Sequence, residues 1–180
     1  MSEEAALSRP QVSIVIPVRN EADAVGAAIR SALGQTGAPP LEVIVADGAS
    51  SDGTRTVVSA AAHDDHRVRL ISNPAGKTPT GLNEAIKASQ GDVIVRCDAH
   101  SRLPENYVAR AMELLDETGA DVVGGTQRAV GRTFWQRAVA IAMTTPAGVG
   151  DARFHTGGRP GPVDTVYLGV FQRAALERSG

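Results

Sequence analysis

The chain has 180 residues and a mass of 18.7 kDa, which is enough for one domain with a substantial buried core. Hydrophobic residues make up 42% and charged residues 21%, a mixture typical of a globular protein and not of a disordered one. The net charge of −2, the lack of a dense basic run and the few aromatic residues argue against a nucleic-acid partner.

The single cysteine and the apolar stretches bear on the cell compartment. Cys97 has no partner for an internal disulfide, which indicates a reducing compartment. The longest purely apolar stretch, Ala138 to Met143, is far too short to cross a bilayer of about 30 Å. Residues 1–9 are acidic and polar and lack the apolar segment of a signal peptide. We therefore expect a cytoplasmic protein.

Apolar β-branched runs alternate with segments of helical periodicity along the first two thirds of the chain. The runs that predict strands are residues 12–16, 41–46, 68–71, 92–97 and 121–123. Apolar residues at helical spacing lie between these runs, within residues 25–33, 57–61, 82–86 and 104–115. This alternation predicts an α/β fold with a single Rossmann-like, mostly parallel sheet that carries helices on both faces.

The pattern loosens after Gly125. Residues 132–143 have helical periodicity, and residues 144–162 are rich in Gly, Pro and Thr, which predicts an irregular loop. Residues 163–170 alternate enough to predict an edge strand, and a last helix is expected to start near Gln172.

Four polar segments follow predicted strands. They are Pro17–Glu21, Asp47–Asp52, Asn73–Lys77 and Asp98–His100. Ligands of parallel α/β sheets gather beyond the carboxyl ends of the strands. We therefore expect these four segments to lie at one edge of the sheet.

Asp98 and His100 are candidate metal ligands. A carboxylate oxygen suits Mg²⁺ or Mn²⁺, and an imidazole shifts the preference towards Mn²⁺. The alternative is a polar strand end, in which Asp98 caps the following segment and His100 is solvated. Two ligands alone do not define a site.

The other segments have both structural and functional interpretations. Pro17 is expected to end the first strand and Asn20 to cap the next helix. The Asp52-Gly53 pair predicts a tight turn, whereas Asp47 ends a strand and can accept a base N–H. Lys77 can neutralise an anionic partner, although a solvated loop lysine is the common alternative.

Taken in order, four stretches resemble family 2 glycosyltransferases with the GT-A fold. They are VSIVIPVRNE (12–21), LEVIVADGASSDGT (41–54), NPAGKTPTGLNEAI (73–86) and DVIVRCDAH (92–100). The DAH form and the stretch VDTVYLGVFQR (163–173) are most similar to succinoglycan-type exopolysaccharide glycosyltransferases. The resemblance implies an N-terminal tail (1–10), a nucleotide-sugar-binding half (11–125) and the start of a truncated acceptor half (126–180).

The resemblance also implies roles for individual residues in binding a nucleotide-sugar, most often a UDP-sugar. Pro17, Asn20 and Glu21 would line the nucleoside pocket. Asp47 would contact the base, and Lys77 would lie near the base or the diphosphate.

Asp98–His100 matches the family's D-x-D motif, whose carboxylates contact the ribose and the metal-bound diphosphate. The resemblance therefore implies a divalent cation, Mn²⁺ or Mg²⁺, at Asp98 and His100. His100 stands where a metal-ligating aspartate is usual. On the acceptor side, the resemblance points to Asp164, Thr165 and Tyr167.

The implied reaction is direct displacement at the anomeric carbon with inversion, to a glycan or lipid-linked acceptor. The carboxylate base of the family lies downstream of the stretch that 163–173 matches, so we expect the base beyond Gly180. In full-length relatives, membrane helices often follow the catalytic domain and place it at the inner face of the membrane.

Three other functions make different demands on the sequence. A non-catalytic nucleotide-binding or scaffold fragment of the same fold is the alternative, since we expect the catalytic base beyond Gly180. A nucleotidyltransferase would need a Gly-rich loop with an arginine after the first strand, and PVRNE does not provide one. A dinucleotide oxidoreductase would need G-x-G-x-x-G at that place, which is also missing.

Overall fold

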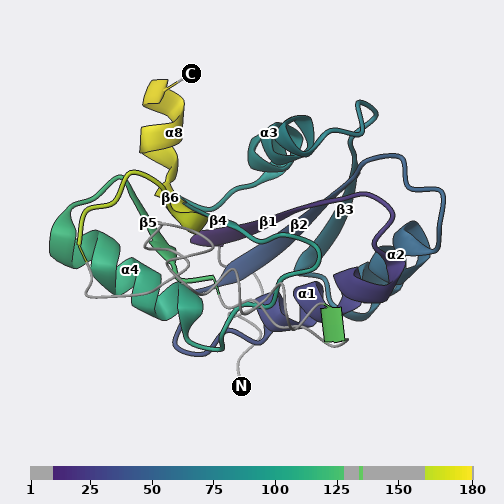
Figure 1. Ribbon diagram of the computed structural model, residues 1–180, viewed down its shortest axis with the longest axis horizontal. Coiled ribbons are helices and arrows are strands. Elements are labelled where there is room, and N and C mark those ends of the chain that lie inside the picture. Colours follow the sequence, from purple (N-terminus) through teal and green to yellow (C-terminus); the bar gives the residue numbers. More distant parts are fainter. Residues whose placement is uncertain (1–9, 128–133, 136–160, 180) are drawn as a thin grey trace. The chain divides into compact units, whose positions relative to one another are not determined.

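The computed structural model describes residues 10–127, 134–135 and 161–179. The elements alternate along the chain as expected (Figure 1). Their bounds are β1 (Val12–Val18), α1 (Ala22–Leu33), β2 (Leu41–Asp47), α2 (Thr54–Asp64), β3 (Val68–Ser72), α3 (Thr78–Ala88), β4 (Val93–Arg96), α4 (Tyr107–Thr118), β5 (Val122–Gly125), β6 (Tyr167–Gln172) and α8 (Arg173–Ser179). The predicted helix at 132–143 and loop at 144–162 lie outside the described residues, apart from 134–135 and 161–162.

The described strands form one mixed sheet in the order β3-β2-β1-β4-β6-β5. β1 pairs in parallel with β2 and β4, and β2 pairs in parallel with β3. β6 runs antiparallel to β4. The predicted α/β fold with a mostly parallel sheet is confirmed.

The chain divides into two compact units. The first comprises residues 1–123 and 170–180, and the second comprises residues 124–169. The core and the polar segments after β1 to β4 belong to the first unit. No helix among the described residues has the length and apolar character needed to cross a membrane.

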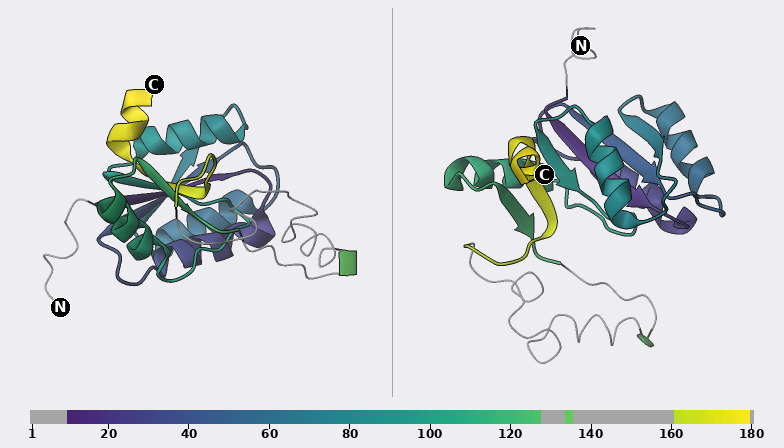
Figure 2. Two further views of the ribbon diagram at one scale, coloured as in Figure 1. Left: turned by 60° about the vertical axis from the view of Figure 1, so that its left-hand side comes forward. Right: turned by 90° about the horizontal axis from the view of Figure 1, so that it is seen from above.

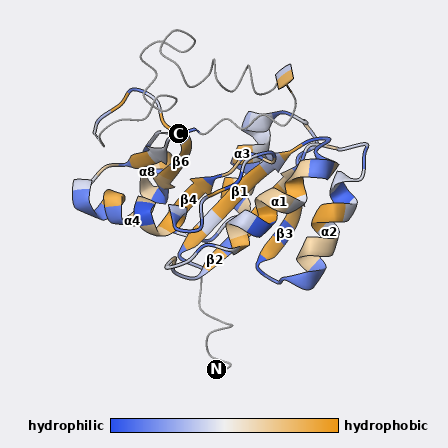
Figure 3. Cartoon of the chain, turned by 60° about the horizontal axis from the view of Figure 1, so that its bottom comes forward, coloured by the Kyte–Doolittle hydropathy of each residue, from blue (hydrophilic) through white to orange (hydrophobic). Residues whose placement is uncertain are grey.

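Helices cover both faces of the sheet in the first unit. α3 lies on one face of β1 and β2, and α1 and α2 lie on the other (Figures 1 and 2). Side chains alternate between the faces of a strand, so neighbouring apolar residues of β1 enter different layers. Val15, Ile44 and Ile94 pack with Ala85 of α3, in the layer between the sheet and α3. In Figure 3 the strands are largely hydrophobic, whereas the helices combine hydrophobic and hydrophilic residues.

Two sequence predictions about the strands are wrong. The strand predicted at 163–170 is β6 at Tyr167–Gln172, and it lies between β4 and β5 instead of at an edge. Its central residues are buried because they have neighbours on both sides. Pro17 also does not end β1, which continues to Val18. The pairing with β4 stops at Val15, so the missing N–H of Pro17 breaks no ladder bond there.

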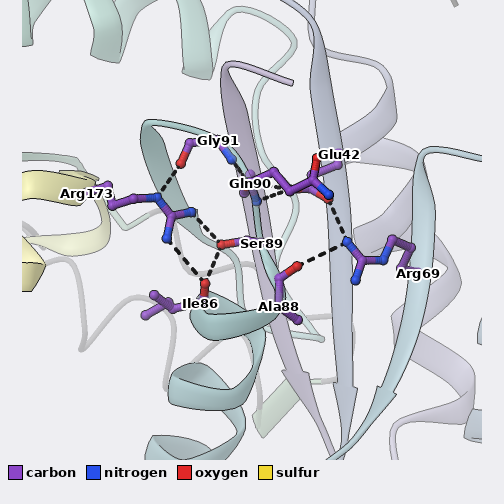
Figure 4. Close-up of polar contacts among 9 residues, drawn as sticks. Glu42, Arg69, Ile86, Ala88, Ser89, Gln90, Gly91 and Arg173 are labelled. Carbon is purple, nitrogen blue, oxygen red and sulfur yellow. Dashed lines mark hydrogen bonds and ion pairs between the residues drawn. The ribbon is translucent and has the colours of Figure 1, made fainter. Parts of the chain in front are cut away.

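A polar network joins the amino ends of the central strands (Figure 4). The buried Glu42 carboxylate accepts hydrogen bonds from Ser13 Oγ (2.7 Å), the backbone N of Gln90 (2.6 Å) and Arg69 Nη1 (3.2 Å). Nearby, Arg173 donates to Gly91 O (2.7 Å) and to Ser89 Oγ (2.8 Å). These bonds fix the turn between α3 and β4.

Candidate functional site

A cleft of about 270 Å³ lies at the carboxyl edge of the sheet, within the first unit. Three of the four polar segments predicted to meet there line it. The lining residues are Pro17, Val18, Arg19, Glu21, Asn73, Gly76, Lys77, Thr78, Arg96, Asp98, Ala99 and His100. The fourth segment, Asp47–Asp52, is not part of the lining but is hydrogen-bonded to the first segment.

Asn20 connects the loops after β1 and β2. Its Oδ1 accepts a hydrogen bond from the backbone N of Ser51 (2.8 Å), and its own N–H donates to Ser50 Oγ (2.9 Å). Its backbone has a φ of +54°, in the left-handed region that asparagine tolerates better than most residues. The prediction that Asn20 caps α1 is wrong, because Glu21 occupies the N-cap position and makes no side-chain cap bond.

Asp52 ties together the starts of α1 and α2. Its carboxylate accepts hydrogen bonds from the backbone N–H groups of Ala22 (3.2 Å) and Thr54 (2.9 Å) and from the Thr54 hydroxyl. The bonds from Thr54 hold the pKa of Asp52 below its usual value. Thr54 Oγ1 in turn accepts from the backbone N of Glu21 at 2.9 Å. The turn interpretation of Asp52-Gly53 is consistent with these bonds.

Asp47 ends β2 and is fully buried. Its Oδ2 pairs with Arg55 Nη1 at 2.9 Å, and the backbone N of Ser50 approaches both carboxylate oxygens at 3.4 Å. Asp47 is not among the residues that line the cleft. The Ser50 contacts are long for hydrogen bonds, so Oδ1 keeps most of its accepting capacity.

The loop after β3 is organised by Asn73, which is buried. Its Nδ2 donates to Lys77 O (3.0 Å), and its Oδ1 accepts from Thr80 Oγ1 (3.0 Å). Gly76 has a φ of +66°, and a Cβ there would lie 2.8 Å from Arg19 Nη1. The Arg19 guanidinium donates to Gly76 O at 3.3 Å. The loop thus holds Arg19 and the exposed Lys77 on the same cleft.

Asp98 and His100 each have a charged or polar neighbour in the cleft. Arg96 Nε donates to Asp98 Oδ1 at 3.0 Å. His100 Nδ1 lies 3.7 Å from Glu21 Oε1, and the His100 side chain is exposed. No bond to Asp98 Oδ2 occurs among the described residues, so this oxygen is available to a ligand.

A carboxylate and an imidazole are groups that can bind a divalent cation whose remaining ligands come from a substrate. Within the described ranges, no three His, Cys, Asp or Glu side chains are grouped closely enough to hold a metal ion together. Mg²⁺ and similar cations are often bound by one or two protein groups plus substrate phosphates. A carboxylate oxygen and an imidazole in one loop are compatible with that kind of site.

The cleft carries more cationic than anionic side chains. The lining includes three cationic side chains, Arg19, Lys77 and Arg96, and two carboxylates, Glu21 and Asp98. The two arginines are absent from the residues predicted from the sequence, although both lie inside the quoted motifs. The signal that could have found them is their position, since each directly ends or follows a strand at the ligand edge.

Cys97 lies between Arg96 and Asp98 and is fully buried. Burial and the neighbouring Asp98 charge raise the pKa of its thiol to about 12. The prediction that Cys97 fills core space is confirmed, and a buried thiol of this kind is not a nucleophile at neutral pH.

The acceptor-side residues lie in the second unit. Asp164 and Thr165 are exposed, and Tyr167 is the first residue of β6. Their role at an acceptor remains a prediction.

The chain is similar to a known protein family and to curated proteins. The model of the family described as "Glycosyl transferase family 2" matches residues 13–180. The succinoglycan biosynthesis protein ExoA of Rhizobium meliloti is 34% identical over 146 residues, which are 80% of this chain and 44% of that protein. ExoO of the same organism is 37% identical over 114 residues, 63% of this chain and 32% of that protein. The chain thus spans less than half the length of these relatives.

Solved structures with a similar fold come from other organisms. The mannosyltransferase PcManGT of Pyrobaculum calidifontis, in complex with GDP-Man and Mn²⁺, has a TM-score of 0.68 and 27% identity, over 97% of this chain and 48% of that one. S. aureus TarS in complex with UDP-GlcNAc has a TM-score of 0.65 and 16% identity, over 94% of this chain and 47% of that one. The TarS likeness shows the fold alone.

Proposed function

The chain belongs to glycosyl transferase family 2, and from this we propose that its cleft binds a nucleotide-sugar, with a UDP-sugar as the favoured donor. The sugar is transferred with inversion to a glycan or lipid-linked acceptor. The observation that carries the proposal is the cationic cleft at the carboxyl edge of the sheet, lined by three segments that follow β1, β3 and β4. A nucleoside diphosphate is an anionic ligand of suitable chemistry for Arg19, Lys77 and Arg96.

In this proposal, Asp47 recognises the base. A carboxylate oxygen accepts the ring N–H of uracil, and it would equally accept the ring N–H of guanine. Cytosine offers no such donor, so CDP is disfavoured. Because Asp47 is buried, its loop, residues 48–51, has to open towards the base. PcManGT binds GDP-Man and TarS binds UDP-GlcNAc, so both kinds of base are represented among the similar structures.

The sugar diphosphate lies over Lys77 and the Asp98–His100 loop in this proposal. Asp98 and His100 would hold a Mn²⁺ or Mg²⁺ ion, which would offset the charge that develops on the departing diphosphate. PcManGT was solved with Mn²⁺. The Asn73 Nδ2 group donates a hydrogen bond to Lys77 O and so fixes the Lys77 backbone, and the Lys77 side chain adds positive charge next to the leaving group.

Calorimetric titration with UDP and GDP in the presence of Mn²⁺ tests the proposal. We expect binding of at least one of the two nucleotides, weakened about tenfold or more by Asp47→Ala or Asp98→Ala, since each removes a charged hydrogen-bonding group. Arg110→Gln on α4 is the matched control, because this exposed side chain pairs with Glu113 away from the cleft. Absence of both UDP and GDP binding with Mn²⁺ present would refute the proposal.

A second function is nucleotide-sugar binding without transfer. An inverting transferase needs a carboxylate base at the acceptor hydroxyl. The two carboxylates that line the described cleft each have a cationic or imidazole neighbour: Asp98 lies beside Arg96, and Glu21 lies beside His100. Neither is therefore assigned as the base that a transferase needs. A turnover assay with labelled nucleotide-sugars separates the two functions, since binding without transfer or hydrolysis favours the second.

A further inference from the structure

Arg96 is the last residue of β4, and its guanidinium lines the cleft. An arginine carries five N–H donors, and the Nε donor is used by Asp98 Oδ1 at 3.0 Å. The described residues give the Nη1 and Nη2 groups no further partner. Two terminal nitrogens with unused donors form the planar fork that matches a phosphate group.

Arg19 approaches the same cleft from the end of β1. One hydrogen bond, from Nη1 to Gly76 O at 3.3 Å, holds its guanidinium against the β3 loop. Gly48 and Gly76 leave the space that the Arg19 side chain occupies, because a Cβ at either position would crowd it. Hydrogen bonds to Gly76 O and to Asp98 thus hold Arg19 and Arg96 in the lining of the same cleft.

The charges of the cleft lining favour an anion without help from a metal ion. Arg19, Lys77 and Arg96 supply three permanent positive charges against the two carboxylates of Glu21 and Asp98. His100 is an imidazole and adds no negative charge, unlike an aspartate. The side chains themselves thus attract a diphosphate.

We propose that Arg96, assisted by Arg19, binds the diphosphate of the nucleotide directly, so that nucleotide binding persists when divalent cations are removed. This rests on the proposed function of the cleft. The bond from Nε to Asp98 orients the fork and also leaves Asp98 Oδ2 for a cation. Arg96 therefore supports nucleotide binding, whereas the cation contributes chiefly to the transfer step.

The test is calorimetric titration of the 180-residue chain with UDP, once with Mn²⁺ and once with EDTA. For the unmodified chain we expect the Kd in EDTA to exceed the Kd in Mn²⁺ by a factor of less than about ten. For Arg96→Gln we expect the Kd in EDTA to rise by a further factor of about ten or more. This is the effect of losing one charge-assisted hydrogen bond. Arg96→Lys, which keeps the charge but not the fork, should fall between the two.

Two controls accompany these titrations. Arg110→Gln removes an exposed arginine away from the cleft and should leave both Kd values unchanged. Thermal unfolding of each variant checks that the fold is retained. Arg19→Gln should weaken UDP binding in EDTA more than in Mn²⁺, as Arg96→Gln does.

Several results would overturn the inference. One is loss of UDP binding by the unmodified chain in EDTA while Mn²⁺ supports it. Another is an Arg96→Gln variant that binds UDP in EDTA as well as the unmodified chain. If Arg96→Gln weakens UDP binding in Mn²⁺ but not in EDTA, Arg96 only positions Asp98. Absence of nucleotide binding in both conditions refutes the proposed function itself, and the inference with it.

Discussion

Replacing Glu42 by alanine tests whether the network at the amino edge of the sheet stabilises the fold. Glu42 is buried, and its carboxylate accepts hydrogen bonds from three groups on different segments. In Glu42→Ala the backbone N–H of Gln90 and the Ser13 hydroxyl lose this acceptor. Ser13 Oγ still accepts a hydrogen bond from the backbone N of Gly91, at 2.8 Å.

The expected loss follows from these contacts. A buried donor that loses its acceptor costs about 1–3 kcal/mol, and the hydroxyl of the fully buried Ser13 is one such donor in this variant. The ion pair with Arg69 adds little, because that side chain is 43% exposed and solvent screens it. We therefore expect Glu42→Ala to lower the free energy of unfolding by about 3 kcal/mol. Glu42→Gln keeps an acceptor oxygen and should cost about 1 kcal/mol.

Urea denaturation followed by far-ultraviolet circular dichroism measures both losses. Glu113→Ala is the control, because this exposed glutamate on α4 pairs with Arg110 on the surface and should cost less than about 0.5 kcal/mol. If Glu42→Ala were no more destabilising than Glu113→Ala, the network would not hold the strands together as described.

Three further predictions concern the cleft and its surroundings. Gly76→Ala places an alanine in the left-handed backbone region and a Cβ 2.8 Å from Arg19 Nη1, so both the stability of the fold and the affinity for UDP should fall. Gly119→Ala is the control, because it has the same backbone strain (φ +63°) with open space around it and should lower stability alone. Because burial raises the pKa of the Cys97 thiol to about 12, a thiol reagent at pH 8 should label the chain only after unfolding, and rapid labelling of the folded chain would contradict the buried position. Asp47→Asn should reduce the preference for UDP over CDP in competition titrations, whereas an unchanged preference would remove Asp47 from base recognition.

Much of the fold follows from the alternation of apolar runs and helical periodicity. The first four strands lie within a few residues of their predicted positions, because each is a buried run of branched residues bounded by Gly, Pro or polar residues. β6 was less predictable. Its place between β4 and β5 depends on pairing with residues about 80 positions away, which local periodicity does not encode.

The site was predictable in its location but not in its contacts. The rule that ligands gather at the carboxyl ends of parallel strands located Pro17–Glu21, Asn73–Lys77 and Asp98–His100 on one cleft. The same rule did not reveal that Asn20 holds the neighbouring loop instead of capping a helix. Arg19 and Arg96 were overlooked because an arginine in a loop is usually solvated, and only the folded chain brings the two to the same cleft.

The most direct test of the nucleotide-binding cleft is a titration of ¹⁵N-labelled protein with UDP and Mg²⁺, followed by amide chemical shifts. The cleft described above predicts the largest shift changes at residues 17–21, 73–78 and 96–100, with smaller changes in the loop after β2. Asp116 of α4 and Glu177 of α8, which lie near the amino end of β4 at the opposite edge of the sheet, should not change. Shift changes centred on that opposite edge, or none at saturating UDP, would contradict the assignment of the cleft.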